Sequence, residues 1–182
     1  MTFGVAVLAY WSVACTPVWA EPALSAESST PAVSAPSVVP PGKPERTIIE
    51  NMRTIMLLLK NHDKIDFTVK IIPGGVQTTN TSPDPVVAAA IQQHAADMKQ
   101  RNEEGINVRP LDPLFQELIR RHAEIVVKLK NIPNGVIEWE TSTNPQVTLL
   151  IRAHTKTVTE FVKYGLPRAQ QPSPLPKGYH GG

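Results

Sequence analysis

The sequence contains two copies of one unit, offset by sixty residues without a gap. Between residues 58 and 105, 15 of 48 positions are identical to the position sixty residues later, whereas ordinary residue frequencies give about three by chance. Two copies are too few for a solenoid. We therefore expect two similar halves, residues 46–105 and 106–165, packed around a pseudo-two-fold axis.

Each copy predicts two helices joined by a turn and a short strand. Residues 47–50 (Thr-Ile-Ile-Glu) form a capping box, and apolar residues continue at helical spacing as far as position 69. Pro73 should end this helix. The Thr-rich segment 76–82 favours a strand. Asp84-Pro85 then opens the second helix, with Asp as cap and Pro at the first helical position, and Gly105 ends it.

The expected fold class is mainly α. The duplicated helix–short strand–helix unit predicts a four-helix bundle with a small antiparallel β-ribbon from residues 76–82 and 136–142, and Trp139 covering one end. An alternative is that residues 64–72 form a strand, because their apolar residues alternate. In the second copy Ile125, Val126 and Leu129 fit a helix with Lys128 and Lys130 on its polar side, which favours the bundle.

The N-terminal residues 1–20 have the character of a signal peptide. They carry no charge, and residues 3–15 form an apolar run of the length of a signal core. Cleavage after Ala20 predicts a periplasmic or secreted bacterial protein without cysteine or a membrane span. No Lys or Arg precedes the apolar run, so an uncleaved anchor is an alternative, and a lipoprotein modified at Cys15 is another.

Two proline-rich segments flank the repeats. Residues 21–45 are rich in Pro, Ser and Ala and predict a disordered tether. Residues 166–182 predict a disordered tail in which His180 is solvated.

Four histidines lie at the centre of the apolar stripes, at matching positions of the two copies: His62, His94, His122 and His154. A buried imidazole tends to stay neutral, and neutral imidazole is a metal ligand. Bundle cores commonly hold metals and cofactors. Four imidazoles suit Cu or Zn, and two suit the axial positions of a b-type haem. Met98 is a candidate additional soft ligand.

The leading hypothesis is an exported protein that binds a transition metal, or b-type haem, through this four-histidine cluster for storage, delivery or electron transfer. The bulkier Thr148, Leu149 and Leu150 replace three alanines of the first copy, which favours a metal over haem. A di-iron carboxylate site is excluded because Ile91 and Ile151 stand where it needs Glu. Alternatives are a proton-sensing cluster, or structural histidines in a cofactor-free module that binds a periplasmic partner.

Composition excludes several other functions. A net charge of +2 and 5% aromatic residues give no support for nucleic-acid binding. A single cysteine excludes an internal disulfide and a Cys-ligated iron–sulfur cluster. The sequence lacks a nucleophile elbow and a Gly-rich phosphate loop, so it predicts no particular enzyme class.

Overall fold

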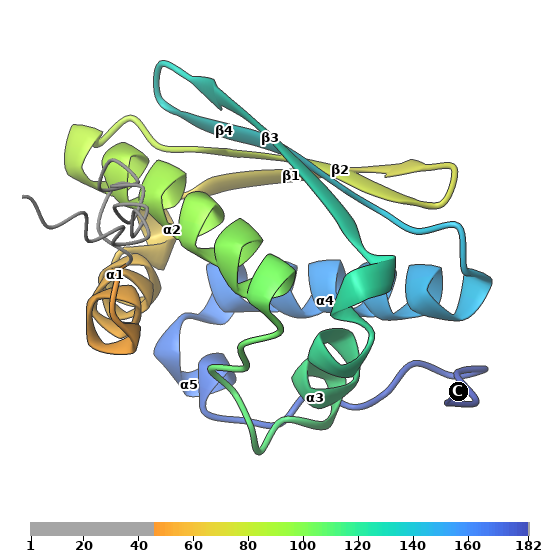
Figure 1. Ribbon diagram of the computed structural model, residues 1–182. Coiled ribbons are helices and arrows are strands. Elements are labelled where there is room, and N and C mark those ends of the chain that lie inside the picture. The colour runs from red at the N-terminus through yellow and green to blue at the C-terminus, as the bar shows by residue number, and fades with distance from the viewer. Residues whose placement is uncertain (1–45, 182) are drawn as a thin grey trace, which may run out of the picture. The chain divides into compact units, whose positions relative to one another are not determined.

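The computed structural model describes residues 46–181, and the signal peptide and tether expected at 1–20 and 21–45 lie outside the described residues. The described chain runs through the same elements twice (Figure 1). The first copy comprises α1 (Ile48–Lys60), β1 (Asp66–Ile72), β2 (Gly75–Thr81) and α2 (Pro85–Glu104). The second comprises α3 (Pro113–Arg120), β3 (Val126–Ile132), β4 (Gly135–Thr141) and α4 (Pro145–Tyr164). Short 3₁₀ turns, His62–Lys64 and His122–Glu124, precede β1 and β3, and α5 (Leu166–Ala169) follows α4.

The four strands form one antiparallel sheet in the order β1-β2-β4-β3. The helices cover one face of this sheet (Figure 1). In the central β2–β4 pair Thr78 lies opposite Glu138, its own equivalent sixty residues later. A pseudo-two-fold axis relating the two copies therefore passes through this pair at the centre of the sheet.

The predicted four-helix bundle is wrong, because residues 66–72 and 126–132 are strands rather than continuations of helices. The fold is α/β, with a helix–β-hairpin–long-helix unit repeated twice. In β3 the exposed Lys128 and Lys130 alternate with the less exposed Val127 and Leu129. Spacing of two suits a strand with one buried face. The two lysines therefore mark the exposed face of a strand and not the polar side of a helix.

The starts of α1 and α2, the end of α2 and the central strand pair confirm the local predictions, whereas α1 ends at Lys60 and not just before Pro73. The Thr47–Glu50 capping box is present, with Thr47 N donating to Glu50 Oε2 at 2.8 Å. Asp84 accepts from Val86 N at 2.9 Å, and Gly105 ends α2 in the left-handed conformation. The segments expected to form a ribbon pair antiparallel as β2 and β4.

Trp139 does not cover the end of a bundle. It alternates with Glu138 and Glu140, which face the helices, so it lies on the opposite face of the sheet. There its Nε1 donates to Gln77 Oε1 at 3.2 Å.

Residues 166–181, expected to form a disordered tail, include α5 and a segment that packs on α3. Ser173 is fully buried; its N donates to Asp112 Oδ2 at 3.0 Å and its carbonyl accepts from Leu114 N at 3.3 Å. Tyr179 donates its hydroxyl to Glu117 and packs on the cluster formed by Leu114, Phe115, Leu118 and Leu150. The C-terminal segment is therefore part of the folded unit, while His180 is exposed.

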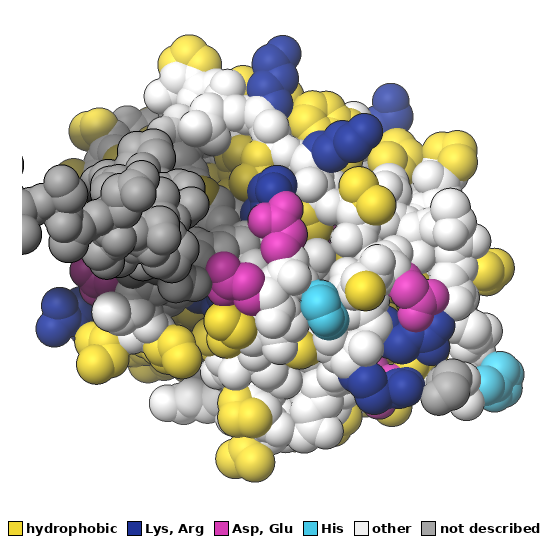
Figure 2. Space-filling view, in the orientation of Figure 1, with side chains coloured by type: hydrophobic (Ala, Val, Ile, Leu, Met, Phe, Trp, Pro, Cys, Tyr) yellow, Lys and Arg dark blue, Asp and Glu magenta, His cyan; other side chains and the backbone are white. Residues whose placement is uncertain are grey.

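The surface of residues 46–181 has no large region of one charge on the face shown in Figure 2, where acidic and basic side chains intermingle. Within the same residues, no helix combines the length and the apolar character that a membrane crossing requires.

Candidate functional site

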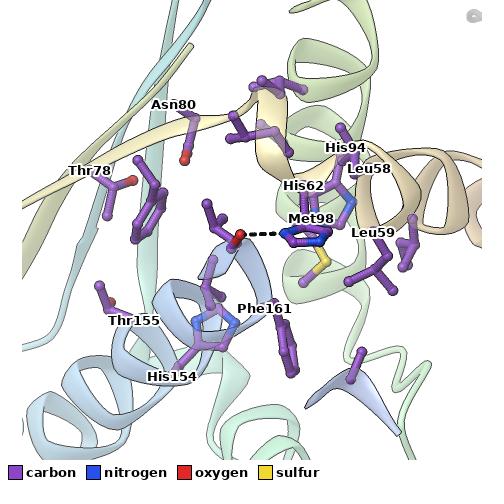
Figure 3. Close-up of a pocket in the computed structure, with 18 of the residues that line it drawn as sticks. Leu58, Leu59, His62, Thr78, Asn80, His94, Met98, His154, Thr155 and Phe161 are labelled. Carbon is purple, nitrogen blue, oxygen red and sulfur yellow. Dashed lines mark hydrogen bonds between the residues drawn. The ribbon is translucent and has the colours of Figure 1, made fainter. Parts of the chain in front are cut away.

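A cavity of about 330 Å³ lies between the sheet and the helices that cover it. This volume is within the range of small-molecule sites. Figure 3 shows side chains from the sheet, from α1 and α2 and from α4 around one space. Most of the cavity's wall is apolar, and its apolar residues include Ile55, Leu58, Leu59, Ile65, Phe67, Ile91, Phe115, Val158 and Phe161.

The first helices of the two copies pack differently around the cavity. In α1 only Asn51 is buried, and five apolar side chains of this helix line the cavity: Met52, Ile55, Met56, Leu58 and Leu59. In α3 the residues Leu114, Phe115 and Leu118 are buried together with Leu150 of α4. The helix α3 is thus part of a buried cluster, while α1 turns most of its apolar side chains toward the cavity.

One polar part of the cavity wall lies on the two central strands. Thr78 and Asn80 of β2 and Glu138 and Glu140 of β4 all line it. These residues are equivalent in pairs, sixty positions apart, so the second copy supplies carboxyl groups where the first supplies a hydroxyl and an amide. The pseudo-symmetric site therefore has an acidic half and a neutral half.

The two carboxyl groups differ in their surroundings. Burial and the neighbouring Glu140 raise the pKa of Glu138 to about 8, so its protonated form dominates at neutral pH. Glu140 Oε2 lies 3.5 Å from Nδ1 of His154. Burial alone would lower the pKa of His154, but the Glu140 carboxylate outweighs burial and raises it. Glu140 and His154 thus favour an ion pair.

Several buried polar atoms of the cavity wall have no hydrogen-bond partner within residues 46–181. They are Thr78 Oγ1, His94 Nδ1 and Arg109 Nε. Burial, followed by the charges of Arg101 and His154, lowers the pKa of His94 to about 4, so its imidazole is neutral. An unsatisfied buried polar group costs about 1–3 kcal/mol, and a bound molecule that pairs with these atoms would recover that free energy.

Three of the four histidines predicted from the repeat line this one cavity: His62, His94 and His154. Figure 3 shows the His62 and His94 rings with Met98 on one side and the His154 ring on the other. His122 is not among the lining residues. Its ring packs instead against Gly105.

His62 and His122 make equivalent bonds between the two copies. His62 Nδ1 lies 2.8 Å from the carbonyl of Val162, and His122 Nδ1 lies 2.7 Å from that of Asn102. A carbonyl only accepts, so each Nδ1 carries the proton and donates it. Each bond joins the 3₁₀ turn of one copy to the long helix of the other, which is the structural role that the sequence left open as an alternative.

Within the described residues, no group of three or more His, Cys, Asp or Glu side chains is arranged to hold a metal ion. Met98 lines the cavity and its Sδ accepts from Arg101 at 2.7 Å. The site of Cu, Zn or b-type haem at His62, His94, His122 and His154 stays a prediction.

The sequence reasoning missed the polar residues of the sheet. Thr78 and Asn80 share the face of Val76, as Glu138 and Glu140 share that of Val136, because side chains alternate along a strand. The repeated Val76 and Val136 mark the face toward the core, and that signal could have placed both carboxyl groups inside.

Comparisons with models of protein families, with curated proteins and with solved structures found no match to this chain. The cavity and its polar wall are therefore the basis for assigning a function.

Proposed function

We propose that the protein binds a small organic molecule in the cavity between the sheet and the helices. The observation that carries this proposal is the combination of an apolar wall with a few buried polar atoms that have no partner within residues 46–181, among them Thr78 Oγ1 on β2 and His94 Nδ1 on α2. Such sites bind through their apolar surface and fix the ligand's orientation through a few polar groups.

The apolar wall provides the affinity. Burial of apolar ligand surface contributes about 25 cal/mol per Å² removed from water. Phe67, Phe115 and Phe161 surround the space from three different elements, and aromatic side chains favour offset or edge contacts with a ligand ring. A ligand with one aromatic ring or a short branched chain fits this wall and this volume.

The test is binding of three probes with the same ring and similar length: 2-phenylethylamine, 2-phenylethanol and 3-phenylpropanoate. At least one should raise the melting temperature of the full-length protein saturably, because a ligand of the folded state stabilises it. Ala95→Leu fills space in the cavity wall and should weaken binding at least tenfold. Ala96→Leu, on the exposed side of the same helix, should not. Lack of binding by all three probes, or equal binding by Ala95→Leu, contradicts the proposal.

A transition metal or b-type haem is a second candidate, favoured by one observation. The His62 Nδ1 proton is held by a backbone carbonyl, which is how metal-ligating histidines are commonly oriented, with Nε2 free to bind. Addition of Cu²⁺ or haemin should then change the visible spectrum, and His62→Ala should abolish that change. An unaltered spectrum contradicts this candidate without affecting the first.

A further inference from the structure

We propose that the ligand carries a protonated amine, which the carboxyl groups of Glu138 and Glu140 bind at the sheet end of the cavity. This inference rests on the proposed function and specifies the class of ligand.

The arrangement of acceptors on the cavity wall supports an ammonium group. Glu138 and Glu140 are two residues apart on β4 and face the same side of the sheet. Thr78 lies directly across the β2–β4 pair from Glu138, is 6% exposed, and has no partner for its hydroxyl within residues 46–181. Figure 3 shows the Thr78 side chain pointing into the cavity. An ammonium group has three donors and no acceptor, which matches the oxygen acceptors gathered on this part of the sheet.

Among the described residues, no cationic group of the cavity wall is paired with Glu138. His154 of α4 is paired with Glu140. His94 of α2 is neutral because burial lowers its pKa to about 4. His62, in the turn after α1, donates to the carbonyl of Val162.

Arg109 also lines the cavity, where its Nε is buried without a partner within residues 46–181, while its two terminal nitrogens are bound to other groups. Its Nη2 donates to Asp112 at 3.1 Å and its Nη1 to the carbonyl of Ala169 at 2.8 Å. The guanidinium lies 5.1 Å from the centre of the Phe115 ring and 5.3 Å from that of Phe161. The Asp112 carboxylate therefore balances the charge of Arg109, and the guanidinium makes cation–π contacts with both rings.

Proton release accompanies binding of an amine. At neutral pH the Glu138 carboxyl is protonated, and an ammonium group beside it favours the carboxylate. The Glu138 proton then passes to solvent, and the ammonium–carboxylate pair remains. Affinity for an amine should therefore rise between pH 6 and pH 8, by up to about tenfold per pH unit, whereas affinity for a neutral ligand should not.

The experiment compares dissociation constants of 2-phenylethylamine, 2-phenylethanol and 3-phenylpropanoate by calorimetry at pH 6, 7 and 8. Wild-type protein should bind the amine at least tenfold more tightly than the other two at pH 8. Glu138→Gln should remove that preference and its pH dependence. Glu103→Gln, on the exposed side of α2, is the matched control and should behave as wild type.

The outcomes separate the two proposals. Tighter binding of the alcohol or the carboxylate than of the amine overturns the amine inference and leaves the cavity function standing. Absence of binding by all three probes overturns the cavity function itself. If Glu138→Gln does not fold, the pH dependence of the wild-type protein decides: amine affinity that does not change from pH 6 to pH 8 contradicts the inference.

Discussion

At the scale of single residues, Glu138 and His94 both line the cavity and both favour the uncharged form. Burial raises the pKa of one and lowers that of the other. Their effects on stability therefore run in opposite directions with pH.

Glu138 should make the fold less stable as pH rises. Its pKa is about 8 in the folded protein against 4.5 as the ordinary value, so the native state holds a proton that the unfolded chain has lost. The contribution of Glu138 to the free energy of unfolding is fully present below pH 4.5 and is lost as pH rises toward 8. Glu138→Gln should remove this loss. In urea unfolding, the free energy of unfolding of the variant should therefore increase relative to that of the wild type between pH 5 and pH 8. A constant difference between the two proteins across that range contradicts the assignment.

His94 should make the fold less stable in acid. Its pKa is about 4 in the folded protein against 6.5 as the ordinary value, so the unfolded chain binds a proton that the native state excludes. Stability is complete above pH 6.5 and falls by up to about 3 kcal/mol as pH drops toward 4. His94→Gln should lose less over the same range. The difference between variant and wild type, measured by urea unfolding, isolates His94 from the carboxylates that also titrate there.

The residue identities located the four histidines of the repeat but not their hydrogen-bond partners. The sixty-residue repeat gave all four positions and indicated a role for neutral imidazole. It could not show that Nδ1 of His62 faces Val162 or that His154 faces Glu140, because those partners come from the other copy or from a neighbouring strand. The carboxyl groups were missed because polar residues in a strand are ordinarily assigned to its solvent side.

At the scale of secondary-structure elements, glycines end both long helices where a histidine of the other copy packs. Gly165 has a φ of 62°, and a Cβ there would lie 2.4 Å from His62 Cδ2. Gly105 has a φ of 68° and would bring a Cβ to 2.9 Å from His122 Nε2. The two contacts are equivalent, so helix termination and packing between the copies are linked at both sites.

Gly165→Ala should therefore destabilise the protein by more than its backbone conformation alone requires. A non-glycine residue in this region costs about 1–3 kcal/mol, and displacement of His62 from Val162 adds to it. Gly178→Ala is the matched control, because Gly178 also has a positive φ of 81° but no atom within 4 Å of a Cβ. Thermal unfolding should give a clearly larger loss for Gly165→Ala, and equal losses would show that the His62 contact contributes nothing.

Helices were predicted correctly where residues at their starts carried the signal. They were predicted wrongly where pairing with a neighbouring strand determines the structure. Capping residues and a proline located the starts of α1 and α2. The apolar residues of segment 66–72 are compatible with both the helical period of 3.6 residues and the strand period of two. Its pairing with β2 makes it a strand. Hydrogen bonds between strands are not visible in a single segment's periodicity.

At the scale of the whole molecule, the two copies depend on each other. The sheet is continuous across β2 and β4, and the His62 and His122 bonds cross from one copy to the other. The C-terminal segment adds a further layer over α3. We therefore expect one cooperative unfolding transition rather than two.

Removal of residues 172–182 should lower the free energy of unfolding. It deletes both backbone bonds of Ser173 and the Tyr179–Glu117 contact. At about 1 kcal/mol for each net hydrogen bond, the loss should be on the order of 2–3 kcal/mol. Removal of residues 181 and 182 alone is the control and should have no effect on urea unfolding. A shortened chain as stable as the intact one would show that this segment is not part of the fold.

The central claim is that the space beneath the central strands is a ligand site. Its most direct test is the position of bound 2-phenylethylamine, measured by nuclear Overhauser contacts in the full-length protein. The ring protons should contact Phe67, Phe115 and Phe161, and the methylene next to the amine should contact Thr78 and His154. Contacts confined to surface residues outside the cavity, with none to these five, would contradict the account.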